Sequence, residues 1–247
     1  MTAILFIHGF PFDHTMWRRQ VVALPRWQSI APDLAGVGET PGPASSDEYS
    51  VALYAADLVA MLDRLKVEQT VICGLSMGGY IAFELLRRHA RRVRGAILCN
   101  TKAAADTPEA KQDRDAMTVL AKQSGSSAIA ERLLPKLLAR ATFERRPEIV
   151  SEVRGMMTRA SVPGIIGALH ALRERPDSTP LLKTIGVPVL VIAGEEDQIA
   201  PAAGMREMAG TIPGARFVVI SEAGHVAPLE QPDAVNTAIG EFLRNLD

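Results

Sequence analysis

Six short runs of apolar, largely β-branched residues recur along the chain, and stretches with helical periodicity separate them. The runs are AILFIHG (3–9), SIAPD (29–33), TVICG (70–74), GAILCN (95–100), VPVLVIAG (187–194) and RFVVIS (216–221). Continuous apolar runs of this length are typical of parallel strands that are buried on both faces. The alternation therefore predicts an α/β fold, a doubly wound sheet of about six parallel strands with right-handed crossovers.

The alternation stops between about 101 and 180, where Ala, Arg, Lys, Leu and Met dominate. We interpret 106–177 as a helical cap inserted between strands of one α/β core, which 1–105 and 178–247 form. Helices are predicted over 50–65, with Ser50 as N-cap, over 232–246, with Pro232 in the first turn, and in the cap over 108–123, 126–141, 147–159 and 163–173.

Charge and composition exclude several classes of partner. The 27 basic and 28 acidic residues give a net charge of −1, so no overall field attracts nucleic acid or an anionic membrane. The first residues, MTAILFIHGF, lack the basic start of a signal peptide, and no apolar run is long enough to span a membrane. Cys73 and Cys99 each lie near the end of an apolar run and are predicted to be reduced. We expect a cytoplasmic enzyme with a small-molecule substrate; the sequence predicts no particular oligomeric state.

The segment CGLSMGG (73–79) places Ser76 between Gly74 and Gly78, directly after a predicted strand and before a helical pattern. This is the context of the G-x-S-x-G turn, in which a strained backbone projects the serine hydroxyl above the sheet. Side chains in place of the two glycines would strike the neighbouring strand and the new helix. Ser76 is therefore the predicted nucleophile, and the alternative is a small residue in a glycine-rich turn.

A serine hydroxyl is a poor nucleophile at neutral pH, so a base and an acid that orients the base are also needed. His225 follows the last strand, where a loop can reach the carboxyl edge of the sheet, and it is the predicted base. The acid should follow an earlier strand, and Glu195, Glu196 and Asp197 are the candidates there. The other histidines have different predicted places: His8 after the first strand, His14 and His89 at helix ends, and His170 on the cap.

Together these features resemble the α/β-hydrolase superfamily over the whole chain. The segments GLSMGGY and LCNTKAAADTPEA are most similar to small bacterial carboxylesterases and to 3-oxoadipate enol-lactonases. The family's order of serine, acid and histidine, with a glycine three residues before the acid, implies the triad Ser76, Asp197 and His225. Some relatives carry the acid after the preceding strand, but that position is around Asn100, which cannot hold the charge.

The resemblance also implies an oxyanion hole. The segment FIHGFPFDH (6–14) is similar to the family's His-Gly loop, which assigns the backbone N–H of Phe10 as one donor, and the N–H of Met77 is the other. APDLAGVGET (31–40) is similar to a family loop in which Asp33 has a structural role. The chain begins at what the family counts as its third strand, so the first two strands are expected to be missing.

The reaction that follows is acyl transfer, because a serine rather than an aspartate at the turn argues against dehalogenase and epoxide hydrolase chemistry. We expect a carboxylesterase for short or medium acyl chains. The alternatives are an enol-lactonase, whose substrate would need an inward-facing Arg or Lys, then a thioesterase or perhydrolase, and a non-catalytic binding protein. No metal or cofactor is predicted, since no zinc-spaced cluster, P-loop or dinucleotide motif is present. Beside Phe10 and Met77, the predicted pocket wall comprises Phe12, Leu75, Met156, Met157 and His170.

Overall fold

The computed structural model describes residues 3–246, so the ends of the predicted core, 1–2 and 247, lie outside them. Its centre is a six-stranded sheet in the order β2-β1-β3-β4-β5-β6, in which every neighbouring pair is parallel. The predicted doubly wound α/β fold is therefore confirmed. The strands are β1 (Ala3–Ile7), β2 (Gln28–Ile30), β3 (Thr70–Leu75), β4 (Val93–Cys99), β5 (Val189–Gly194) and β6 (Arg216–Ile220).

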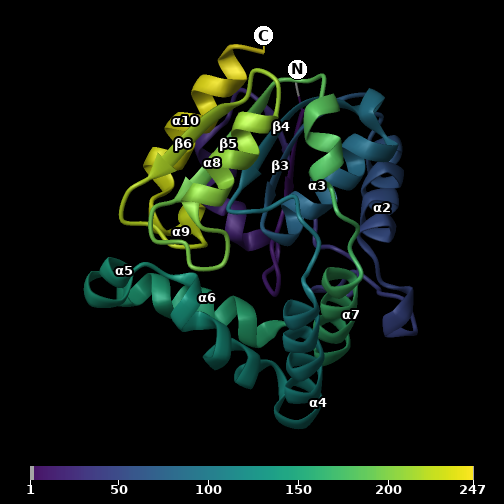
Figure 1. Cartoon of the computed structure of the whole chain (residues 1–247), viewed down its shortest axis with the longest axis vertical. Helices are drawn as coiled ribbons and strands as arrows, with labels where there is room; N and C mark the ends of the chain where they lie inside the picture. Colours follow the sequence, from purple (N-terminus) through teal and green to yellow (C-terminus); the bar gives the residue numbers. More distant parts are fainter. Residues whose placement is uncertain (1–2, 247) are drawn as a thin grey trace.

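Helices cover both faces of the sheet, as Figure 1 shows. One face carries α2 (Val51–Arg64), α3 (Met77–Arg88) and α8 (Ala202–Thr211), and the other carries α1 (Arg18–Ala23), α9 (Ala227–Glu230) and α10 (Pro232–Arg244). Strand side chains alternate between the two cores: in β1, Leu5 and Ile7 face the first and Ile4 and Phe6 the second. The predicted N-cap of α2 is confirmed, because Ser50 Oγ accepts the Leu53 N–H at 3.0 Å.

Between β4 and β5 the chain forms a helical segment that lies beyond the ends of the strands, at the bottom of Figure 1. It comprises α4 (Pro108–Leu137), α5 (Arg140–Arg145), α6 (Pro147–Arg159) and α7 (Val162–Arg173). The predicted helices 108–123 and 126–141 are joined as α4, with a break at Gly125, whose φ is 74°. The predicted end at 141 is wrong. Leu138 is extended, and the Leu137 carbonyl accepts a hydrogen bond from the loop after β6 instead of continuing the helix.

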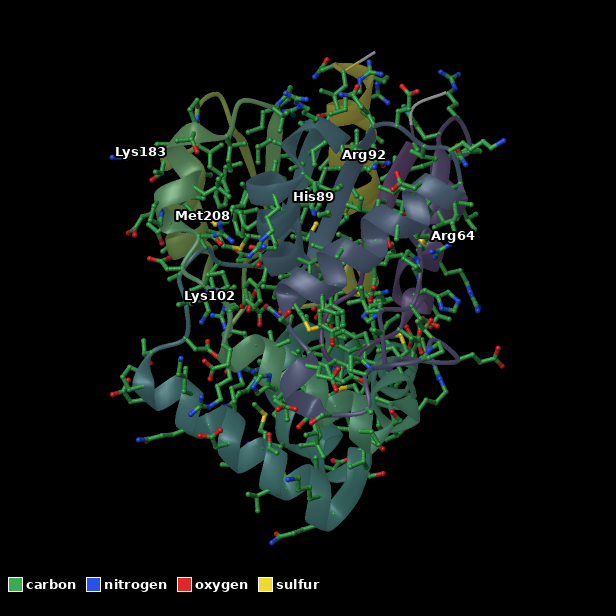
Figure 2. All side chains as sticks on the ribbon, turned by 90° about the vertical axis from the view of Figure 1, so that its right-hand side faces the viewer. Arg64, His89, Arg92, Lys102, Lys183 and Met208 are labelled. Atoms are coloured by element: carbon green, nitrogen blue, oxygen red, sulfur yellow. The ribbon has the colours of Figure 1, made fainter. Side chains whose placement is uncertain are left out.

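The two connections between the sheet and this helical segment lie side by side. The Ser178 N–H donates to the Ala103 carbonyl at 2.9 Å, and Arg175 forms a buried ion pair with Asp106 at 2.7 Å. Figure 2 shows Lys102 where the chain leaves the sheet toward α4. The predicted limits of the cap, 106 and 177, fall in these two connections. The division into a core and a cap stays a prediction.

Candidate active site

The chain turns from β3 into α3 at a single residue, Ser76. Its φ of 54° and ψ of −112° are unusual for a residue with a side chain, and such backbone strain is typical of functional sites. The Ser76 N–H donates to the Cys99 carbonyl at 3.0 Å, and Thr101 Oγ1 donates to the Ser76 carbonyl at 2.9 Å. These two bonds to the end of β4 fix the turn and keep the partly exposed serine at the carboxyl edge of the sheet.

Two glycines make this turn sterically possible. A Cβ on Gly74 would lie 2.3 Å from the Gly78 carbonyl oxygen in the new helix, and a Cβ on Gly78 would lie 2.1 Å from the Ile7 carbonyl oxygen in β1. Both obstacles are backbone atoms, which cannot rotate away as a side chain can. The structure thus confirms the predicted reason for glycine before and after Ser76.

Asp197 and His225, which are 28 residues apart in sequence, are hydrogen-bonded to each other. Asp197 follows β5 and His225 follows β6, so the parallel strands bring both to one edge of the sheet. The distance between Asp197 Oδ2 and His225 Nδ1 is 2.8 Å, and the two residues are only 5% and 2% exposed. A buried pair of this geometry holds the imidazole in one orientation.

The Asp197 carboxylate has only donors around it. Oδ1 accepts the backbone N–H groups of Ile199 at 2.8 Å and Ala200 at 2.9 Å, while Oδ2 accepts Asn100 Nδ2 at 2.9 Å in addition to His225. Burial by itself raises the pKa of Asp197, but the His225 ring and these hydrogen bonds outweigh it and hold the pKa below its usual value. Asp197 is therefore an ionised acceptor, so His225 Nδ1 donates the proton of their hydrogen bond and Nε2 is the ring nitrogen left on the other side.

Asn100 has a part in this site that sequence reasoning missed. Its side chain donates to Asp197 Oδ2 and, at 3.1 Å, to the carbonyl of Gly224, the residue before His225. The sequence marked this position only as one that cannot supply the acid. One signal in the sequence could have revealed this role. Asn100 follows a strand at the position where some relatives carry the acid, so its side chain could be expected to face the site.

Ser76 lies on the same edge of the sheet as this pair. Leu75, the residue before it, pairs with Cys99 of β4, and Cys99 precedes Asn100, whose side chain reaches Asp197. Within residues 3–246 no hydrogen bond joins Ser76 Oγ to His225. Hydrogen bonds of this kind are often long without substrate and tighten in the substrate complex.

A small cavity separates the loop after β1 from α7. Phe10, Phe12 and Met77 line one side of it, and Ser161 and Ile165 lie on the other. Its volume of about 10 Å³ is close to the minimum for one water molecule. Phe10 and Met77, the residues of the two predicted oxyanion donors, thus line one cavity, whose lining includes none of Ser76, Asp197 and His225.

The other predicted pocket residues lie elsewhere. Leu75 and Met157 are fully buried in the core, and His170 Nδ1 is hydrogen-bonded to the Tyr49 carbonyl at 3.1 Å. Met156 lines an open groove of about 1600 Å³ on the side of β2 and α6, a groove whose lining includes none of Ser76, Asp197 and His225. The groove meets the small cavity along Pro11, Phe12, Val37 and Ala160, which line both.

The rings of His8 and His14 also have hydrogen-bond partners outside the Asp197–His225 pair. His8 is fully buried; its Nδ1 donates to the Gly9 carbonyl at 3.0 Å and its Nε2 accepts the Leu34 N–H at 3.1 Å, which fixes the loop that carries Phe10. Burial lowers the pKa of His8, so the ring is neutral in this role. His14 Nδ1 is hydrogen-bonded to Asp33 Oδ1 at 2.8 Å.

His89 is the C-cap of α3, where its backbone N–H donates to the Leu85 carbonyl. Figure 2 shows it on the part of the molecule away from α4–α7. The 12 residues of α3 separate it from Ser76, a rise of about 18 Å.

The described residues, 3–246, bear on two other kinds of site. They contain no group of three or more His, Cys, Asp or Glu side chains placed to hold a metal ion. None of the helices described is long and apolar enough to cross a membrane. Cys73 and Cys99 are both free and buried, as predicted.

Comparison with known proteins gives matches along nearly the whole chain. A family model described as alpha/beta hydrolase fold matches residues 2–232. An AB hydrolase superfamily protein of Bacillus subtilis, YisY, is 32% identical over 97% of this chain and 90% of its own length. A thermophilic esterase from Thermogutta terrifontis, solved with malate bound, has a TM-score of 0.97 and 40% identity, covering 100% of this chain and 90% of its own. The enol-lactonase of Burkholderia xenovorans LB400 has a TM-score of 0.91 and 32% identity, and the match covers 98% of this chain and 91% of the lactonase chain.

Proposed function

Because the chain belongs to the alpha/beta hydrolase family, we propose that it is a carboxylesterase that cleaves esters of short or medium acyl chains through an acyl-enzyme on Ser76. The observation that carries this proposal is the buried Asp197–His225 hydrogen bond on the sheet edge where the strained Ser76 lies. The similarity to an esterase at 40% identity supports the same reaction class.

In the first half of the reaction, His225 Nε2 takes the proton of Ser76 Oγ as the oxygen attacks the ester carbonyl carbon. The Asp197 carboxylate stabilises the imidazolium that forms. His225 then returns the proton to the departing alkoxide, and the alcohol leaves. In the second half, His225 takes a proton from water as the water oxygen attacks the acyl carbonyl carbon. The bond to Ser76 Oγ then breaks, His225 returns the proton to Ser76 Oγ, and the carboxylic acid leaves.

The negative charge that develops on the carbonyl oxygen needs fixed donors. We assign the backbone N–H groups of Phe10 and Met77 to this role; Met77 is the first residue of α3, where an N–H has no partner within the helix. Loss of one such donor typically costs about 2.7–4 kcal/mol in the transition state. Phe10, Phe12 and Met77 are the proposed acyl contacts. Since their cavity has room for about one water molecule, an acyl chain must displace the facing side chains of α7.

A serine-reactive fluorophosphonate tests the nucleophile directly. We expect one covalent adduct per chain, which tandem mass spectrometry locates on the peptide that contains Ser76, because only a serine with a base beside it reacts rapidly. Heat-unfolded protein is the control and should remain unlabelled. A folded protein without an adduct on Ser76 would favour a non-catalytic binding protein of the same fold.

The second candidate is a lactone hydrolase, which the 32% identity to an enol-lactonase favours. The chemistry would be the same, and the two activities differ in the substrate that the pocket accepts. We expect kcat/KM for p-nitrophenyl butyrate to exceed that for 3-oxoadipate enol-lactone by at least about tenfold, a difference of about 1.4 kcal/mol in transition-state binding. Steady-state kinetics on both substrates measure it, and a higher value for the lactone would reverse the ranking.

A further inference from the structure

A buried carboxylate that the proposed mechanism does not use lies beside the loop between β6 and α9. This loop contains Gly224 and His225 and is called the histidine loop below. Glu230, the last residue of α9, is 0% exposed. Within residues 3–246 no cation forms an ion pair with its side chain; three neutral donors surround it instead. Burial raises the pKa of Glu230 against the effect of these donors. A carboxylate is costly to bury, so its position needs a reason beyond filling space.

The three donors come from two parts of the chain that are otherwise far apart in sequence. Oε1 accepts the N–H of Gly224, the residue before His225, at 2.7 Å. Oε2 accepts the N–H of Ala139 and the hydroxyl of Thr142, both at 2.7 Å, at the junction of α4 and α5. One side chain thus ties the histidine loop to the helical segment.

The backbone of His225 is held by the same junction. Its N–H donates to the Leu137 carbonyl at 2.8 Å. A Cβ added to Gly224 would lie 2.7 Å from both the Leu137 oxygen and the Ala139 nitrogen, so the two backbones touch. The position of the imidazole therefore depends on α4 and α5 as well as on Asp197.

We propose that Glu230 is a positioning residue for His225: its carboxylate holds the Gly224 N–H and the junction Leu137–Thr142 together, and so keeps His225 Nε2 directed at Ser76. This inference rests on the proposed role of His225 as base. Reaction rates are sensitive to such placement, and a misplacement of about 1 Å can cost about 10²-fold.

The substitution Glu230→Gln tests this assignment, because glutamine has the same shape but only one acceptor oxygen. Whichever way the amide turns, its NH₂ group faces an N–H or O–H donor. We expect kcat per active site, titrated with a fluorophosphonate, to fall about 10²-fold while KM changes less than about threefold. We also expect the low-field proton resonance of His225 Nδ1–H to shift or broaden. The matched control is Glu144→Gln, an exposed glutamate on α5 that pairs with Arg140, and it should behave as wild type.

A milder pair of substitutions keeps the test decisive if Glu230→Gln does not fold. Thr142→Val removes one donor and should lower kcat about 3- to 10-fold, and Thr142→Ser should restore it. A wild-type kcat per titrated site in Glu230→Gln, or in Thr142→Val where Glu230→Gln does not fold, would overturn the positioning role even if the melting temperature fell. Ser76→Ala separates this result from the proposed function, since an active Ser76→Ala would contradict the nucleophile and leave the Glu230 contacts unaffected.

Discussion

Replacement of Ser76 by alanine is expected to lower kcat for ester hydrolysis about 10⁶-fold, because no other group can form the acyl-enzyme. The free energy of unfolding should change by less than about 0.5 kcal/mol. Alanine meets the same backbone strain at a φ of 54°, and the bonds that hold the turn use the Ser76 backbone rather than its hydroxyl. Steady-state kinetics with p-nitrophenyl butyrate and urea unfolding measure the two quantities.

An exposed serine gives the matched control for this substitution. Ser124 lies on α4 with an exposed side chain, so Ser124→Ala should keep wild-type turnover. If Ser76→Ala also kept turnover within about tenfold of wild type, Ser76 would be a structural turn residue, and the acyl-enzyme mechanism would be wrong.

Replacement of Asp197 by asparagine is expected to reduce kcat about 10⁴-fold, and the reason lies in the four donors around the carboxylate. Asparagine has one oxygen, which the two backbone N–H groups at the Oδ1 position will take. Its NH₂ group then faces His225 Nδ1, which must become an acceptor. The proton moves to Nε2, so the ring can no longer accept the proton of Ser76.

Glu196 provides the control for this prediction, because it is adjacent in sequence and was a candidate acid. Its side chain is exposed and accepts the Arg140 N–H at 2.9 Å instead of contacting His225. Glu196→Gln should therefore keep kcat within about twofold of wild type. Near-normal kcat in Asp197→Asn together with a large loss in Glu196→Gln would move the acid role to Glu196. Thermal unfolding of each variant checks that the fold is intact.

The sheet and the serine turn could be predicted because local sequence encodes them. Each strand is a short apolar run, and the turn needs glycine at fixed distances from Ser76, where the structure has backbone atoms within 2.3 Å of an added Cβ. Parallel strands that end at one edge predicted an acid near His225, and the resemblance to the family selected Asp197 from Glu195, Glu196 and Asp197. The geometry of Asp197 and His225 agrees with that expectation, whereas their catalytic role stays a prediction.

Residues that act through contacts between distant segments could not be predicted in the same way. Asn100 reaches Asp197 across 97 residues, and Glu230 reaches Ala139 across 91. Neither contact leaves a periodic pattern in the sequence. The wrong end of the second cap helix has the same origin, because the carbonyl of Leu137 is used by the histidine loop.

Pocket residues on the helical segment were the least predictable from sequence. Met156 and Met157 are neighbours on α6 and both are buried in the same hydrophobic core, yet only Met156 also borders the open groove. His170 turns toward the Tyr49 carbonyl. Helical periodicity gives the faces of a helix, but it does not say which face docks on the sheet and which faces an open space.

The bonds between the histidine loop and the junction Leu137–Thr142 also limit how such a chain can be recombined with its relatives. None of the three proposed catalytic side chains lies between β4 and β5, so helices could be exchanged there to change substrate range without altering the chemistry. A chimera whose breakpoints keep residues 137–142 from the parent that supplies His225 and Glu230 should retain turnover. A swap that splits these six residues from their partners would disturb the base while every catalytic residue remained present.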